Sequence, residues 1–223
     1  MTQFEDAPRM AISTKVYRFC PQPTKAASPV FDSDVDRKAV IASFHQPRVG
    51  QWCADRKSLE KGALVPSALR EAYGIKALPH ILQNAIGWVA VSETVRSAIE
   101  TLEPGVHAFT AEIPVTYKDG RAAEHRYFGL GWGADLVGSI NVEKSPWYPS
   151  GVNPNWVGKP GFPVPFYSAA SANKLAINAA VVQGRHLWRA ADYGDEWFCS
   201  EDLYQAFRKG KIQKLDFFEQ GLV

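Results

Sequence analysis

One segment constrains the fold more than any other: a short strand, a helix and a long strand follow one another over residues 88–117. The run WVAV is apolar and rich in β-formers, and Ser92 directly after it can accept a hydrogen bond from the free N–H groups of a helical first turn. Glu93 then places a negative charge where it offsets the helix dipole. Pro104-Gly105 ends the helix, so we predict a strand–helix–strand unit here.

A second segment near the end of the sequence follows the same plan. Trp197 opens a short strand, Ser200 and Glu201 repeat the Ser-Glu pair, and an amphipathic stretch runs to Gly210 before the chain returns over residues 212–218. Two copies are too few for a solenoid. The pattern fits a true repeat, and it equally fits a common unit that is used twice.

The rest of the sequence indicates antiparallel pairing. Lys118-Asp119-Gly120 supplies the positive φ angles of a tight hairpin turn, and regular strand–helix alternation, which would favour a doubly wound sheet, is missing. Short helices are expected at 66–73 and from 78–82. We therefore predict an α+β fold, a mostly antiparallel mixed sheet with a few short helices packed on it and two strand-Ser-Glu-helix-strand units.

We expect this fold to form a single domain over residues 1–223. A chain of this length can bury a sizeable core as one large domain or as two small ones. The alternative is a subdivision into an N-terminal part, 1–77, and a main part, 78–223.

Composition excludes several classes of protein. The net charge is only +2, whereas a general nucleic-acid binder needs a strong basic excess. No apolar run approaches the length of a membrane span, and the first ten residues do not resemble a secretory signal. Cys20, Cys53 and Cys199 form no C-x-x-C pair, so neither a disulfide framework nor a zinc knuckle is indicated. Free thiols suit a reducing compartment, and we expect a cytoplasmic protein.

No motif demands catalysis, a metal or a cofactor. The five histidines form no compact metal pair, and neither a nucleophile elbow nor a P-loop is present. The glycines at 129–133 lack the helix that a dinucleotide site requires. We therefore predict no catalytic, metal or cofactor-binding residues. The enzyme alternative, for example a hydrolase, would use His107 and His125, which lie on strands expected to pair.

An aromatic, proline-rich loop over residues 145–165 is the most distinctive surface candidate. Such long ordered loops are often functional, and Trp and Tyr are preferred anchors of protein interfaces. Trp147, Tyr148 and Trp156 are therefore the predicted partner-binding residues. Trp can also stack on sugars, so a sugar-binding module is a further alternative, and the rings could instead cover a thin core.

Several stretches resemble a family of predicted immunity proteins from bacterial polymorphic-toxin systems. The stretches are LPHIL (78–82), VSETVRSAIETLEPGVHAF (91–109), RYFGL (126–130) and WFCSEDLYQAFRKGKIQKLDF (197–217), and KVYRF (15–19) suits the opening strand of that family. His80 stands where the family often has an acidic residue. The resemblance carries over no catalytic residue.

The resemblance implies a small α+β protein encoded beside a toxin. It would be a non-enzymatic immunity protein that binds and neutralises its cognate protein toxin in the cytoplasm. Under the enzyme alternative, His107 and His125 would instead serve a hydrolase or a toxin-modifying activity. Neither a nucleic acid nor a membrane is an expected partner, and the sequence leaves self-association undetermined.

Overall fold

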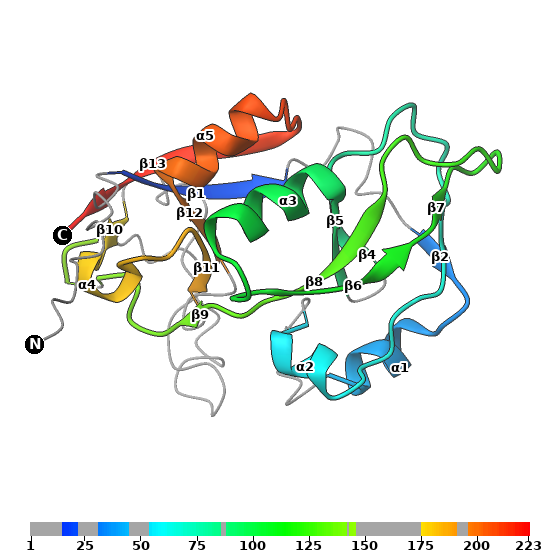
Figure 1. Ribbon diagram of the computed structural model, residues 1–223, viewed down its shortest axis with the longest axis horizontal. Coiled ribbons are helices and arrows are strands. Elements are labelled where there is room, and N and C mark those ends of the chain that lie inside the picture. Colours follow the sequence, from blue (N-terminus) through cyan, green and yellow to red (C-terminus); the bar gives the residue numbers. More distant parts are fainter. Residues whose placement is uncertain are drawn as a thin grey trace, which may run out of the picture.

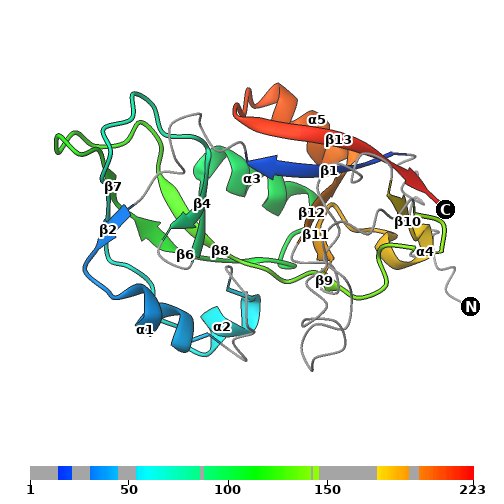
Figure 2. The same ribbon diagram turned by 180° about the vertical axis from the view of Figure 1, so that it is seen from behind.

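The computed structural model describes residues 15–21, 31–44, 54–85, 88–141, 143–145, 175–190 and 196–223. Over these ranges the chain forms three sheets and short helices (Figures 1 and 2). The helices are α1 Arg37–Ala42, α2 Arg56–Glu60, α3 Glu93–Leu102, α4 Ala179–Val182 and α5 Glu201–Lys209.

The largest and the third sheet combine strands from distant parts of the sequence, whereas the second is formed within residues 81–131. The largest sheet has the order β10 Ala176–Ile177, β13 Leu215–Leu222, β1 Val16–Pro21, β12 Glu196–Ser200, β11 Leu187–Ala190, β9 Asp135–Leu136. The second has the order β4 Ile81–Ala85, β5 Trp88–Ser92, β8 Tyr127–Gly131, β6 Ala108–Ile113, and the third β2 Phe31–Ser33, β3 Leu69–Glu71, β7 Val115–Thr116. Most pairs are antiparallel, and the exceptions are β10 with β13, β11 with β9, and β3 with β7. The predicted α+β class is confirmed.

The two strand–helix–strand units have the same topology. In the first, β5 and β6 are joined by α3, and both pair antiparallel with β8, which lies between them. In the second, β12 and β13 are joined by α5, and both pair antiparallel with β1. The central strand follows the first unit in the sequence but precedes the second, so the two units are related by a permuted chain order. We call them the α3 unit and the α5 unit.

Equivalent hydrogen bonds show how far this correspondence extends. At the start of α3, Ser92 N–H donates to the His80 carbonyl over 2.7 Å and Glu93 N–H donates to that of Arg126 over 3.0 Å. At the start of α5, Ser200 N–H donates to the His186 carbonyl over 3.0 Å and Glu201 N–H donates to that of Lys15 over 3.1 Å. Each helix is thus attached to the two strands beside it in the same way.

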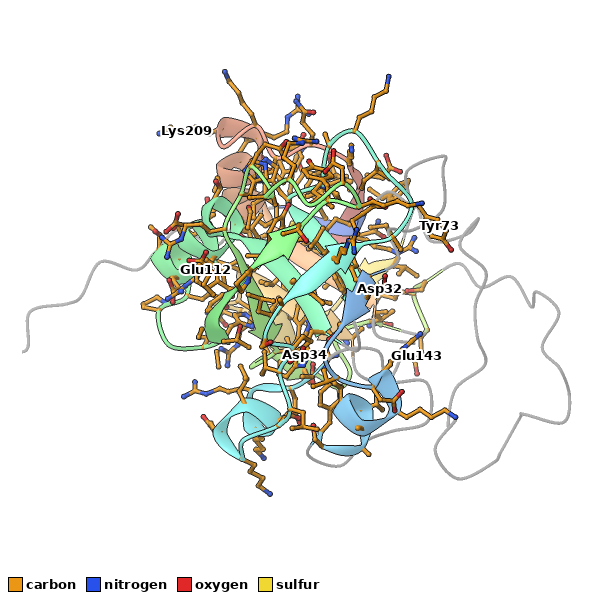
Figure 3. All side chains as sticks on the ribbon, turned by 90° about the vertical axis from the view of Figure 1, so that its right-hand side faces the viewer. Asp32, Asp34, Tyr73, Glu112, Glu143 and Lys209 are labelled. Carbon is orange, nitrogen blue, oxygen red and sulfur yellow. The ribbon has the colours of Figure 1, made fainter. Side chains whose placement is uncertain are left out.

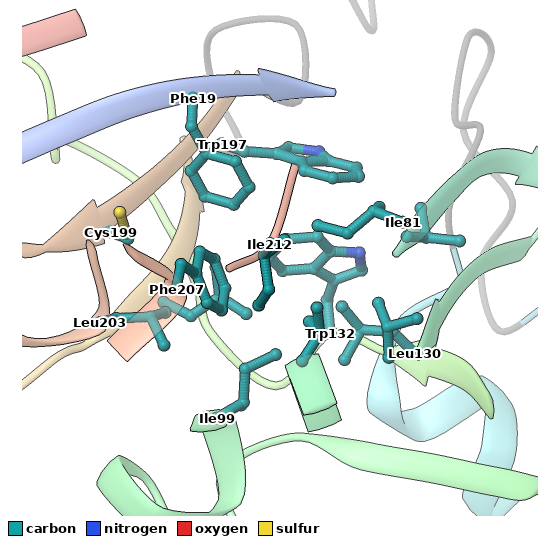
Figure 4. Close-up of a cluster of buried hydrophobic side chains, with 14 of the residues drawn as sticks. Phe19, Ile81, Ile99, Leu130, Trp132, Trp197, Cys199, Leu203, Phe207 and Ile212 are labelled. Carbon is teal, nitrogen blue, oxygen red and sulfur yellow. The ribbon is translucent and has the colours of Figure 1, made fainter. Parts of the chain in front are cut away.

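The helices of both units share one hydrophobic core. α3 and α5 are neighbours, and the residues three and seven positions after each capping serine point into a common cluster, shown in Figure 4. Trp132 and Trp197 lie near its centre with ring centroids 5.0 Å apart. The buried members are Tyr17, Phe19, Ile81, Val89, Val91, Val95, Ile99, Leu130, Trp132, Leu187, Trp197, Cys199, Leu203, Phe207 and Ile212.

Two of the expected helices are wrong. Residues 66–73 contain strand β3, and residues 78–82 lead into strand β4. Leu69 is 1% exposed and is paired across the sheet with Val115 on one side and Ser33 on the other. Pairing with distant strands has outweighed the local helix signals here, because strand preference depends mainly on cross-strand neighbours.

Candidate functional site

The predicted partner-binding aromatics Trp147, Tyr148 and Trp156 lie outside the described residues. The same is true of nearly all of the 145–165 loop, so the sugar-binding alternative also stays a prediction. Among the described aromatics, Tyr73 is the most exposed, with 60% of its surface accessible.

The structure separates the two histidines of the enzyme alternative. His107 precedes Ala108, which pairs with Gly131, whereas His125 lies two residues before Tyr127, which pairs with Ile113. These are opposite ends of the β6–β8 hairpin, and five residues of strand span roughly 16 Å. The expected approach of His107 and His125 is therefore wrong.

Two other histidines each contact a helix-capping serine. The Ser92 hydroxyl accepts from Val95 N–H over 3.4 Å and lies 2.9 Å from His80 Nδ1. In the α5 unit, the Ser200 hydroxyl accepts from Leu203 N–H over 3.3 Å and lies 2.8 Å from Nδ1 of His186. Each contact is a hydrogen bond between the serine hydroxyl and Nδ1, in which the tautomer of the imidazole decides which of the two donates.

These serine–histidine pairs support the fold, and their geometry is not that of a nucleophile. Ser92 is fully buried and Ser200 is 3% exposed, and each hydroxyl already caps a helix. In a catalytic triad the carboxylate holds one ring nitrogen and the serine the other. Here Asp202 lies 3.7 Å from Nδ1 of His186, the atom that also faces Ser200.

The surroundings of the two imidazoles differ in charge. The rings of His80 and His125 stack with centroids 4.2 Å apart, and burial, followed by the proximity of His125, lowers the pKa of His80. His186 instead has the carboxylate of Asp202 as its neighbour. The same serine–histidine bond thus lies next to a second imidazole in one unit and next to an acid in the other.

A buried carboxylate joins the end of α3 to strand β11 of the largest sheet. Oε2 of Glu103 accepts from Leu187 N–H of β11 over 2.8 Å and from His107 Nε2 over 3.3 Å. His107 Nδ1 in turn accepts from Gly133 N–H. Burial alone would raise the pKa of Glu103, but the hydrogen bonds from His107 and from the backbone of β11 hold it below its usual range.

An ion pair lies beside this network. Arg189 is 2% exposed and forms two hydrogen bonds of 2.6 Å with the Asp135 carboxylate. Its guanidinium also lies over the Trp132 ring, 5.3 Å from the centroid. These groups bind one another between β9, β11 and the end of β8, so they connect strands rather than present a reactive atom.

Sequence reasoning missed the serine–histidine pairs and the Glu103 network. The sequence offered one signal for the serine–histidine pairs: a histidine lies 12 residues before Ser92 and another 14 residues before Ser200. This spacing becomes informative only when the strand pairing that brings each histidine to its serine is known. Glu103 gave no such signal, since its partner Leu187 is 84 positions away.

No group of three or more His, Cys, Asp or Glu side chains in the described part of the chain is arranged to hold a metal ion. Of the helices described, none combines the length and the apolar character that crossing a bilayer requires.

Fold and polar networks together define an α+β protein in which two permuted strand–helix–strand units share a core. A family model described as the immunity protein family Imm11 matches residues 66–221, well over half of the chain. The protein therefore belongs to the Imm11 immunity protein family. The match covers both units apart from strand β1, and it confirms the family resemblance found in the sequence. Comparison with curated proteins gives no significant match.

Proposed function

We propose that this protein is an immunity protein that binds one cognate toxin, encoded by a neighbouring gene, in the cytoplasm of the producing cell. It blocks the toxin by occupying its surface and makes or breaks no covalent bond. Membership of the Imm11 family carries this proposal.

The internal polar chemistry is consistent with a binding role. The groups best suited to catalysis, Ser92, Ser200 and the Glu103–His107 pair, are all buried and engaged with one another or with the backbone. Such internal bonds hold the fold in one arrangement, and a pre-formed surface loses less conformational entropy when it binds.

Stoichiometry tests the proposal directly. The purified protein is titrated into a fixed amount of the toxin encoded by the adjacent gene, and the remaining toxin activity is measured at several incubation times. A blocking protein gives a break at about one equivalent, independent of time, and the two proteins elute together in gel filtration.

An enzyme that inactivates the toxin would behave differently. It would neutralise an excess of toxin progressively and would leave the toxin altered after separation, for example with a changed mass. Either result, or cells that die despite a soluble folded copy of this protein, would contradict the proposal.

A further inference from the structure

A buried carboxylate shapes the loop that follows strand β3. Glu71 is fully buried, and its carboxylate accepts from the N–H groups of Tyr73, Gly74 and Ile75 over 2.5, 2.7 and 3.2 Å. Gly74 has a φ of +80°, which lets the backbone turn around the carboxylate. We call residues 71–76 the Tyr73 loop.

This loop presents an aromatic ring to solvent. Tyr73 is 60% exposed, and Figure 3 looks onto this end of the molecule and shows Tyr73 at its periphery. Desolvating a carboxylate is costly unless its hydrogen bonds are made, so Glu71 strongly favours the one loop conformation that satisfies it. An exposed tyrosine on a loop fixed from inside is a typical interface anchor, since little freedom remains to be lost on binding.

Basic residues from two other segments surround the loop. The Arg70 guanidinium donates to the Lys118 carbonyl in the turn that follows β7, and Lys214 Nζ donates to the Ala77 carbonyl over 3.0 Å. The Lys118 side chain also passes close to Gly74, with its Cδ 3.9 Å from the position that a Cβ would occupy there. The strands and the hairpin thus bring cations to one end of the molecule.

Charges of both signs lie at this end, since the exposed Asp32 stands opposite Arg70 on the neighbouring strand. Glu71 is held by the loop amides, Glu124 accepts from Tyr117 and from Arg121, and Asp119 accepts from the N–H of Arg121. Lys76 and Lys118 are exposed, and neither ammonium group is paired with another described residue. Tyr73 is therefore accompanied by two lysines that form no ion pair with a described residue, on a surface that also carries carboxylates.

We propose that the Tyr73 loop, together with Lys76 and Lys118, is the surface that contacts the toxin. This proposal rests on the proposed function and adds the chemistry of the partner: a pocket that accepts the tyrosine ring, flanked by carboxylates that pair with the two lysines. The ring supplies most of the affinity, and the lysines accelerate association with these carboxylates.

Binding of the toxin encoded by the adjacent gene tests this surface. Affinity and association rate are measured for the full chain and for Y73A, the double variant K76E/K118E, and W147A/Y148A at the sequence-predicted loop. We expect Y73A to weaken binding at least 30-fold. K76E/K118E should slow association about tenfold at low salt and reduce its salt dependence.

Two exposed residues elsewhere provide matched controls. V137A removes a side chain that is 74% exposed in the segment after β9, and K209E reverses one exposed lysine at the end of α5. Both should bind within about twofold of the parent chain. Thermal unfolding of every variant confirms that the fold is intact.

The outcomes separate the two proposals. If the parent chain neither binds nor neutralises the toxin, the proposed function fails, and this surface fails with it. If the parent chain binds but Y73A and K76E/K118E bind equally well, the function stands and the surface is wrong. A loss confined to W147A/Y148A would likewise overturn the Tyr73 surface and favour the aromatic loop.

Discussion

The α3 unit and the α5 unit share a hydrogen-bonding frame but fill it with different side chains. At the two equivalent helix positions, the α3 unit has Val95 and Ile99 where the α5 unit has Leu203 and Phe207. The strand positions differ in the same sense, since Val89 in β5 corresponds to Trp197 in β12. The same hydrogen bonds thus form around side chains of different volume. The smaller side chains of the α3 unit pack against the larger ones of the α5 unit in the close-packed core that they share.

The aromatic character of the α5 unit extends to its central strand and its last strand. Tyr17 stacks on Tyr204 with ring centroids 4.2 Å apart, and Phe217 packs against the rings of Phe19 and Phe207. The α5 unit therefore contributes the larger side chains to the core, and its truncation should cost more than truncation of the α3 unit.

The largest expected effect comes from the equivalent pair Phe207 and Ile99, which are 1% and 2% exposed. F207A should lower the free energy of unfolding by about 4 kcal/mol and I99A by about 3 kcal/mol, because both leave cavities in the shared core. Urea denaturation measures both values. A smaller loss for F207A than for I99A would show that the α5 unit does not dominate the core.

The next effect concerns Glu103, which links the end of α3 to strand β11. E103A leaves the N–H of Leu187 and Nε2 of His107 without their buried acceptor, and it should cost about 3 kcal/mol. E100A, which breaks only an exposed ion pair with Arg96, is the matched control on the same helix and should cost under about 0.5 kcal/mol. Equal losses for E103A and E100A would mean that Glu103 does not stabilise the junction.

Removal of each capping serine tests whether the two frames are energetically equivalent. S92A and S200A should each lower the free energy of unfolding by about 1 kcal/mol, since a helix cap is lost in both units. S97A, on the exposed face of α3, should change it by less than about 0.5 kcal/mol. Losses that differ strongly between S92A and S200A would show that the two caps contribute unequally to the free energy of unfolding despite their shared geometry.

The smallest expected effect is the pH dependence of stability that arises from His80 and its neighbour His125. Burial and the proximity of His125 lower the pKa of His80, so the unfolded chain binds the proton more readily than the folded one. The stability that neutral His80 contributes is then fully present above pH 6.5, the ordinary value for histidine, and is lost as the pH falls below it. Urea denaturation between about pH 5 and 8 should show a shallower loss for H125Q. An unchanged slope in H125Q would exclude His125 as a cause.

Local patterns predicted the parts of the fold that local chemistry determines. Ser92 and Ser200 do cap helices that start at the following glutamates, and Gly120 has the positive φ expected in the hairpin turn. Residues 66–73 and 78–82 were misjudged because their partners, such as Val115 and Val91, lie elsewhere in the sequence.

The candidate sites were less predictable for a similar reason. His80 forms a hydrogen bond with Ser92 only because β4 and β5 pair. Likewise, Lys118 lies beside Gly74 only because β3 and β7 pair. Tyr73 shows no motif in the sequence, and its importance depends on the buried carboxylate beneath it. The family, by contrast, could be recognised from the continuous stretches around α3 and α5.

The permuted order of the two units has a consequence for synthesis. Strand β1 lies between β12 and β13, and Tyr17 bonds to Glu201 across 184 positions of sequence. While the ribosome is still producing the chain, the α3 unit can assemble from consecutive residues, but β1 must wait for its neighbours to emerge. Completion of the α5 unit is then the last folding event, and a nascent chain interrupted before β12 would leave the α3 side of the shared core, with Val95 and Ile99, uncovered.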